Sequence, residues 1–173
     1  MSISVLSTAL VIGIGSLPIC LLDGATKVAS DAENNTKPDK KKDEGSKLSK
    51  MELAILDLTN KERENAGLAP IKADEKLFKV ARAHSANMAQ KERLGHVLDG
   101  KDLGGRLRDV DYSSSGWGEN CAAGQTSAKE VVATWMRSAG HRGNILNSRY
   151  SEIGIGETVN GTLYYTQVFA TPR

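Results

Sequence analysis

Two histidines of this chain follow a glycine where a predicted helix closes. His96 follows Gly95, and His141 follows Gly140. Glycine readily adopts the left-handed conformation that ends a helix, so each imidazole is expected at the start of an irregular segment, in a defined position. Imidazole binds metal ions and transfers protons near neutral pH. The chain has three histidines, and two in the same setting indicate a shared site.

Glu119 is the carboxylate that we expect beside these imidazoles. It stands between Gly118 and Asn120, so little neighbouring bulk screens it from a partner, although the same setting suits a turn residue bonded to a backbone amide. Two imidazoles, one carboxylate and an open fourth position are the ligands of catalytic zinc sites. His96, Glu119 and His141 are therefore the candidate metal ligands.

Hydrolysis at such a site also needs a base and a group that stabilises an oxyanion. Asp102 and Arg142 are the candidates for these two roles, and Asp99 and Asp102 are the aspartates nearest to His96 in the sequence. The chain has no His-Glu-x-x-His motif of the metalloprotease type. A zinc hydrolase is therefore the second hypothesis, behind a site that only binds.

Two further reactive groups are assigned to the core. His84 lies on the apolar stripe of a predicted helix, where a histidine is usually a satisfied core residue. Cys121 is followed by two alanines and has no cationic neighbour in the sequence that would lower the pKa of its thiol. This setting favours a small buried hydrophobe over a nucleophile.

Two predicted helices begin the globular part of the chain. Ser49 and Glu52 form the capping-box pattern that starts the first helix, which Gly67 ends. Asp74 caps the second helix, which runs to about Arg93.

The remaining predicted elements indicate an α+β fold. A third helix starts at the Ser127 capping box and is expected to run unbroken to Gly140, just before His141. A short helical piece is expected near 103–107, and 116–124 reads as tight, glycine-rich backbone. Alternating apolar residues predict strands over 152–159 and 162–170, joined by the type I′ turn signal Asn160-Gly161. Helices followed by strands indicate layers of the two.

The first 30 residues are expected to be a signal peptide or a membrane anchor. Residues 1–22 carry no charge, and Val28-Ala29-Ser30 provides a cleavage pattern, which favours a secretory signal. An uncleaved anchor is the main alternative, since 22 uncharged residues suffice to span a membrane. A lipoprotein site at Cys20 is disfavoured by Ile19 before it. If the signal is removed, Cys121 remains without a disulfide partner.

Residues 31–50 are predicted to be a flexible charged linker, and 51–173 the folded domain. The linker has no aromatic residue and too few aliphatic ones to offset the entropy of ordering. The formal net charge of the chain is +2, and charged residues make up 25% of it. This balance argues against nucleic-acid binding.

Several motifs of the chain resemble the CAP superfamily, also called the SCP or cysteine-rich secretory domain, in its disulfide-free bacterial form. They cover about residues 52–170 and read NKERENAGLAPI, ARAHSANMA, GENCAAG, WMRSAGHRGNILN, EIGIG and YYTQVF. The resemblance implies a secreted α-β-α sandwich with a central cleft. In many eukaryotic members this cleft holds two histidines and two glutamates that can bind a divalent metal, usually zinc. His96, Glu119 and His141 match three of these positions, and Ser138 stands at the fourth.

The resemblance does not imply one reaction, because the activities attributed to the family range from lipid or sterol binding to proteolysis. We therefore expect a secreted or cell-envelope protein whose cleft binds a small molecule, a lipid or an envelope component and takes up zinc or another divalent metal. A zinc-dependent peptidase or esterase is the alternative.

Overall fold

The computed structural model describes residues 47–173 of the chain. The predicted signal peptide or anchor in residues 1–30, and the predicted linker up to residue 46, lie outside the described residues. None of the helices within 47–173 is long and apolar enough to cross a membrane.

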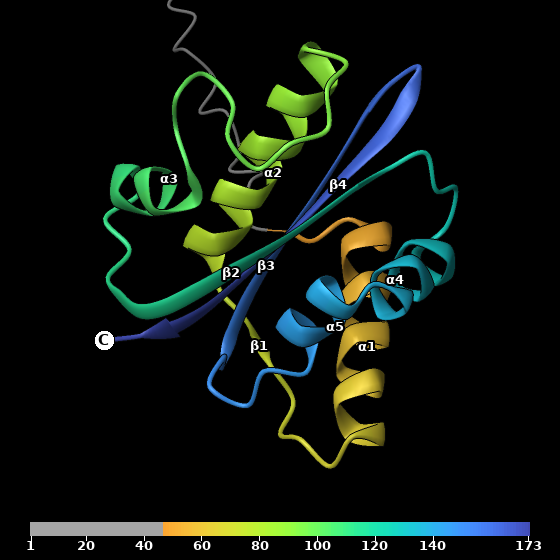
Figure 1. Cartoon of the computed structure of the whole chain (residues 1–173), viewed down its shortest axis with the longest axis vertical. Helices are drawn as coiled ribbons and strands as arrows, with labels where there is room; N and C mark the ends of the chain where they lie inside the picture. Colours follow the sequence, from red (N-terminus) through yellow and green to blue (C-terminus); the bar gives the residue numbers. More distant parts are fainter. Residues whose placement is uncertain (1–46) are drawn as a thin grey trace, which may run out of the picture. The chain divides into compact units, whose positions relative to one another are not determined.

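Five helices and four strands make up this part of the chain (Figure 1). In chain order they are α1 (Lys50–Asn65), β1 (Lys72–Ala73), α2 (Glu75–Gln90), α3 (Leu103–Asp109), β2 (Ser114–Ala123), α4 (Ala128–Arg137), α5 (Ala139–Ile145), β3 (Glu152–Asn160) and β4 (Thr162–Pro172). The sheet order is β1-β3-β4-β2, so β2 forms one edge. Strand β1 runs parallel to β3, while β4 runs antiparallel to both β3 and β2.

Helices cover both faces of the sheet, which confirms the predicted α+β sandwich. Helices α2 and α3 lie on one face, and α1, α4 and α5 lie on the other (Figure 1). Because side chains alternate along a strand, β4 contributes core side chains to both faces of the sheet. Tyr165 and Phe169 pack with the α1 and α4 side, and Val168 and Ala170 pack with the α2 side.

Two glycines of β3 let α2 lie directly against the sheet. A Cβ added at Gly154 would lie 2.0 Å from the carbonyl carbon of Leu77, and one at Gly156 would lie 2.3 Å from that of Ala81. Such distances are far inside van der Waals contact, so the helix backbone occupies the space of both missing side chains. The pattern Ile-Gly-Ile-Gly thus buries isoleucines on one face and accepts a helix on the other.

A buried arginine joins α1 to the chain between α5 and β3. Arg63 is 2% exposed and donates hydrogen bonds to four backbone carbonyls. These belong to Ala69, Ile145, Asn147 and Tyr150, at 2.7–3.2 Å. One guanidinium therefore satisfies carbonyls of the chain after α1 and of the chain from the end of α5 to the start of β3.

The predicted starts of the helices are confirmed. The Ser49 hydroxyl accepts from the N–H of Glu52 and the Glu52 carboxylate accepts from the N–H of Ser49. The Asp74 side chain accepts from the N–H of Leu77 at the start of α2, and the Ser127 hydroxyl accepts from the N–H of Glu130 at the start of α4. Helix α2 ends at Gln90, three residues earlier than predicted.

Two predictions about backbone shape are wrong near the expected site. The third helix is not continuous, because Ser138 is extended (φ −89°, ψ 122°) and separates α4 from α5. Gly140 therefore lies near the start of α5, and His141 lies inside that short helix rather than after a helix end. The glycine-rich segment expected to be tight backbone is strand β2.

The β3–β4 hairpin is confirmed, but its turn is not of type I′. Asn160 still pairs with Thr162, and only Gly161, with φ +66°, has a positive φ at the tip. A type I′ turn needs positive φ at both central residues. The side chain of Asn160 instead donates to the carbonyl of Ala89 at the end of α2.

Candidate functional site

Strand β2 presents alternate side chains to the two helical layers. Glu119 meets Arg106 of α3, and Trp117 lies against Gly104 of the same helix. Ala122 packs in the core on the α1 and α4 side, and the Asn120 amide bonds to α5. The candidate site lies where residues from both layers meet this edge strand.

Glu119 is the centre of a buried polar cluster. Its side chain is 5% exposed, and Oε1 accepts from Nδ1 of His96 at 2.9 Å. Oε2 accepts from the guanidinium of Arg106, whose other terminal nitrogen donates to the carbonyl of His96. Burial by itself would raise the pKa of Glu119, but the bond from His96 and the charge of Arg106 outweigh it and lower the pKa. The carboxylate is therefore ionised at neutral pH.

The contact with Glu119 sets the tautomer of His96. A carboxylate accepts, so Nδ1 carries the proton, and in the neutral ring Nε2 is left with the lone pair. The side chain of His96 is 57% exposed, so solvent and ligands have access to it. The bond to Glu119 raises the pKa of His96, and partial burial opposes it.

His84 supports the loop that carries His96. It is 1% exposed, and its Nε2 donates to the carbonyl of Gly95 at 2.9 Å, directly before His96. The same atom lies 3.7 Å from Oε1 of Glu119. Nδ1 of His84 is buried and has no hydrogen-bond partner among the described residues. Burial lowers the pKa of His84, so this histidine is a neutral core residue, as its place on an apolar helix face predicted.

Asparagines hold α5, and with it His141, against β2. The amide of Asn144 donates to the carbonyl of Glu119 at 3.1 Å and to the Asn120 side chain at 2.9 Å. Asn120 in turn donates to the carbonyl of His141 at 3.1 Å. Burial and then the charge of His96 lower the pKa of His141. His141 is thus a half-buried, neutral imidazole within electrostatic reach of His96.

Gly118 makes this attachment possible. A Cβ at Gly118 would lie 2.8 Å from both the Asn144 Oδ1 and the Tyr150 hydroxyl. Tyr150 donates to the carbonyl of Trp117 at 2.7 Å, and the indole of Trp135 donates to that of Cys121 at 3.3 Å. Side chains thus satisfy three alternate carbonyls of the edge strand, which blocks its pairing with another strand.

The structure brings some predicted residues together and places others elsewhere. His96 and Glu119 are bonded, and His141 is close enough to influence His96 electrostatically. Asp102 is used as the N-cap of α3, where it accepts from the N–H of Gly105. Asp99 pairs with Lys91 and Asn87 at the exposed end of α2. Among the described residues, no hydrogen bond or ion pair joins either aspartate to His96.

The other proposed helper groups also lie apart from Glu119. Arg142 is exposed, and its side chain makes no hydrogen bond to any described residue. Ser138, at the fourth position of the family pattern, forms the break between α4 and α5, and its side chain makes no capping hydrogen bond. Arg106 is the partner of Glu119 that the sequence did not single out. The sequence predicted a helical piece near 103–107, which contains Arg106, but gave no sign that this residue meets Glu119 of β2.

One group of side chains in residues 47–173 has the ligand spacing of a metal site. Ligand atoms of His84, Glu119 and Cys121 all lie within 4.8 Å of one another, and all three residues are buried. Metal binding there would need the Cys121 thiolate, but burial and the charge of Glu119 raise the pKa of that thiol. Cys121 is thus the buried residue that the sequence predicted.

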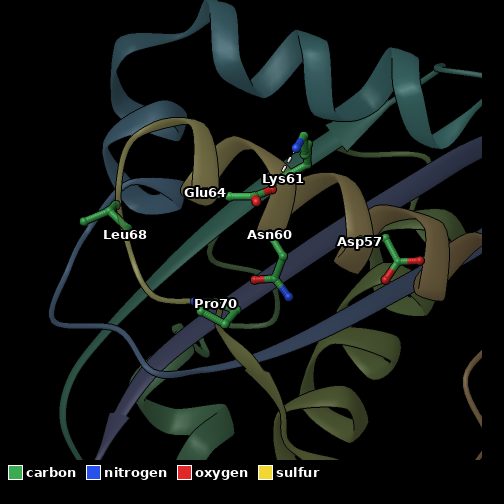
Figure 2. A pocket seen from close by; sticks show the side chains of 6 residues that line it. All are labelled: Asp57, Asn60, Lys61, Glu64, Leu68 and Pro70. Carbon is green, nitrogen blue, oxygen red and sulfur yellow. Dashed lines mark hydrogen bonds and ion pairs between the residues drawn. The ribbon is translucent and has the colours of Figure 1, made fainter.

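Three surface pockets lie away from the histidines. One is formed by α1 and the chain after it, and Figure 2 shows its lining residues, Asp57, Asn60, Lys61, Glu64, Leu68 and Pro70. A second is formed by β2, the chain before β3, and β4, and a third by the β3–β4 hairpin. None of the three is lined by His96, Glu119 or His141, so the candidate site is a group of side chains at the sheet edge rather than one of these pockets.

His96 is expected to have a higher pKa than the other two histidines. The pKa of His96 lies above its ordinary value of 6.5, and those of His84 and His141 lie below it. NMR-monitored pH titration of the ring protons should show His96 gaining its proton first as pH falls. Because its folded-state pKa is raised, the bond to Glu119 stabilises the fold fully below pH 6.5 and loses this contribution as pH rises through the raised pKa. His141 titrating before His96 would contradict the arrangement.

The sequence profile of the cysteine-rich secretory protein family, abbreviated CAP, matches residues 56–171. The uncharacterised protein YkwD of Bacillus subtilis strain 168 is 39% identical over 124 residues, which are 70% of this chain and 48% of YkwD.

Two solved structures are also similar. An extracellular protein with an SCP domain from Bacillus anthracis strain Ames has a TM-score of 0.64 at 32% identity, covering 68% of this chain and 39% of that one. An outer surface protein of Borrelia burgdorferi has a TM-score of 0.67 at 22% identity, covering 73% and 97%, a likeness of fold. This chain spans less than half the length of YkwD and of the B. anthracis protein.

Proposed function

Because this chain belongs to the CAP family of cysteine-rich secretory proteins, we propose that its domain is an extracellular binding module that holds a divalent metal ion, zinc foremost, through His96 and His141. Donor atoms of a bound small molecule, lipid or envelope component would complete the coordination of that ion. The similarity to an extracellular protein of B. anthracis supports the location.

The observation that carries this proposal is the contact between His96 Nδ1 and Glu119 Oε1 at 2.9 Å. Histidines that bind metals usually donate their other ring N–H to a carboxylate, which fixes the tautomer and the ring orientation. His96 has this arrangement, and its side chain is 57% exposed. Nε2, which carries the lone pair, is therefore the atom that would bind the ion.

His141 supplies the second ligand in this proposal. Its pKa is lowered, so the ring is neutral at physiological pH and ready to coordinate. Nδ1 of His141 is buried without a hydrogen-bond partner in the described part of the chain. Its backbone is held through Asn120 and Asn144, so the ring is attached to the same strand as Glu119.

Glu119 orients His96 in this proposal and does not bind the ion itself. Both carboxylate oxygens already accept strong bonds, one from His96 and one from Arg106. Direct coordination would require displacing Arg106, whose side chain is 11% exposed. A buried charge pair that loses one partner is costly, so the orienting role is favoured.

Binding is favoured over hydrolysis because a general base is lacking near the histidines in the part of the chain that the structure describes. Asp102 caps α3, Arg142 is exposed and unpaired among the described residues, and Glu119 is held by Arg106. Bound zinc acidifies water, but turnover also needs groups that move protons and stabilise charge.

Zinc titration by calorimetry of the folded domain tests the proposal. His96→Ala and His141→Ala are each expected to weaken zinc binding by roughly 100-fold or more, since each removes a direct ligand. Glu119→Gln keeps an acceptor but loses the charge, and a second-sphere change of this kind costs about 10–100-fold. Arg142→Ala is the matched control and should bind as the wild type does.

Three outcomes would overturn the proposal. If His96→Ala and His141→Ala both bound zinc with the affinity of the wild type, the ion would not be held by these two histidines. Loss of binding in Cys121→Ser with retention in His96→Ala would place the ion in the buried group of His84, Glu119 and Cys121. Metal-dependent turnover of a peptide or ester substrate that His96→Ala abolishes would make the protein a hydrolase.

A further inference from the structure

A line of buried polar side chains crosses the core from α1 to α5, two helices on the same face of the sheet (Figure 1). Thr59 of α1, Gln167 of β4 and Asn120 of β2 are each 0% exposed. The Gln167 amide donates to the Thr59 hydroxyl at 2.8 Å, and its Oε1 accepts from the Asn120 amide at 3.1 Å. Asn120 in turn donates to the carbonyl of His141 at 3.1 Å. Three buried side chains therefore connect the backbone of His141 to α1.

Gln167 is the polar exception in its layer of the sheet. Tyr165 and Phe169, two positions before and after it, face the same side of β4 and pack in the hydrophobic core. A buried amide needs partners for both its NH₂ group and its oxygen, whereas a leucine at this position would need none. A glutamine here therefore makes a contact that an apolar side chain could not make.

Three hydrogen bonds fix the direction in which the Asn120 amide points. Its Nδ2 donates to Oε1 of Gln167 and to the carbonyl of His141, and its Oδ1 accepts from the amide of Asn144 at 2.9 Å. Turning this amide over would place oxygen against oxygen at two contacts and nitrogen against nitrogen at the third. A single orientation of Asn120 therefore satisfies all of its neighbours.

The direction of the Gln167 amide is set by α1. The Thr59 hydroxyl donates to the carbonyl of Ile55 at 2.7 Å, one turn earlier in the helix, so its oxygen is left as an acceptor. Gln167 must therefore point its NH₂ group at Thr59 and its oxygen at Asn120. The orientation of each amide in the line thus follows from the backbone of α1.

Helix α5, which carries His141, depends on such contacts more than the longer helices do. It has seven residues, two of them glycines, and Ser138 at its N-terminus makes no side-chain capping bond. Glycine disfavours a helix, and a helix this short is not stable without tertiary contacts. Ile145 is its buried residue, so packing holds only the end of α5 that lies beyond His141. Polar contacts therefore decide where His141 lies.

We propose that Gln167 is a positioning residue for zinc binding, acting through Asn120 on His141. The inference rests on the proposed function, because it concerns the same ion. Gln167 gives Asn120 one orientation and α5 one position, so His141 is in place before the ion binds. Without Gln167, the Asn120 amide loses an acceptor and can turn. Zinc binding must then also order α5, and this ordering costs affinity.

Calorimetric zinc titration of the full chain compares Gln167→Met with Thr166→Val. Methionine keeps the volume and removes both polar groups, and we expect the zinc affinity to fall about tenfold, as for other changes outside the direct ligands. Thr166 is the neighbouring buried residue on the opposite face of β4, where it is bonded to the Ser85 hydroxyl at 2.9 Å. Thr166→Val should lower the urea concentration at the unfolding midpoint and keep the zinc affinity of the wild type.

Hydrogen exchange of the metal-free chain gives a readout that does not depend on zinc. The α5 amides should lose protection in Gln167→Met and keep it in Thr166→Val. Thr59→Val removes one hydroxyl at nearly constant shape and is the milder test, which decides the question if Gln167→Met does not fold. It should lower both the zinc affinity and the protection of α5, by less than Gln167→Met does.

Wild-type zinc affinity in folded Gln167→Met, or in Thr59→Val where the first variant does not fold, would overturn this inference and leave the zinc site intact. An equal loss of affinity in Thr166→Val would also overturn it, because the effect would then follow from stability rather than from the position of His141. A wild-type chain that binds no zinc would overturn the proposed function, and this inference with it.

Discussion

Gly154→Ala is expected to destabilise the domain by about 3 kcal/mol or more, at the upper end of the cost of overpacking a core. The added Cβ would meet the carbonyl carbon of Leu77 at 2.0 Å and the backbone nitrogen of Phe78 at 2.3 Å. These are backbone atoms of α2, so a side-chain rotation cannot relieve the clash. Either the helix moves off the sheet or the strand shifts. Urea denaturation followed by circular dichroism measures the loss.

Gly143→Ala is the matched control for this prediction. Gly143 lies in α5, its φ is not in the positive range, and an added Cβ would meet nothing within 4 Å. Alanine favours a helix over glycine by about 0.5–1 kcal/mol, so this variant should be neutral or more stable. Stability of Gly154→Ala within about 0.5 kcal/mol of the wild type would show that α2 does not pack on β3 as described.

Arg63→Met is expected to cost about 3–5 kcal/mol, because it removes a buried guanidinium that donates to four backbone carbonyls. The carbonyls of Ile145, Asn147 and Tyr150 lose their bonds together. Methionine fills much of the same volume, so the loss reports hydrogen bonding more than a cavity. The same denaturation experiment measures it.

The control is Arg137→Met on α4, an exposed arginine with one exposed hydrogen bond to Thr134. It should change the free energy of unfolding by less than about 0.5 kcal/mol. Hydrogen exchange adds a local readout, since the amides of 145–150 should lose protection in Arg63→Met. Equal, small losses in the two variants would mean that the buried bonds of Arg63 contribute little to stability.

Local patterns predicted the starts of the helices and the hairpin. Helix caps act through hydrogen bonds to residues three positions away. Ser49, Asp74 and Ser127 could therefore be recognised as helix starts from the local sequence alone. The Ile-Gly-Ile-Gly alternation likewise identified β3 because a strand repeats every two residues.

Tertiary contacts decided the elements that local patterns misjudged. Strand β2 contains mostly small residues, two of them glycines. It forms a strand because β4 pairs with it and because Tyr150, Asn144 and Trp135 bond to its outer carbonyls. The helical pattern across Ser138 has no strong stop signal. The break there lets Ile145 reach the core and Asn144 reach β2, and packing of this kind overrides propensity.

By itself, the sequence determined the family and the sandwich of helices and strands. These follow from motif order and from periodicity, which are properties of the chain alone. Only the tertiary structure decided that Arg106 and His96 share the Glu119 carboxylate and that Asp102 is used as a cap. The two partners of Glu119 lie 13 and 23 positions away in the sequence, and no local pattern encodes which residues the folded chain brings within bonding distance.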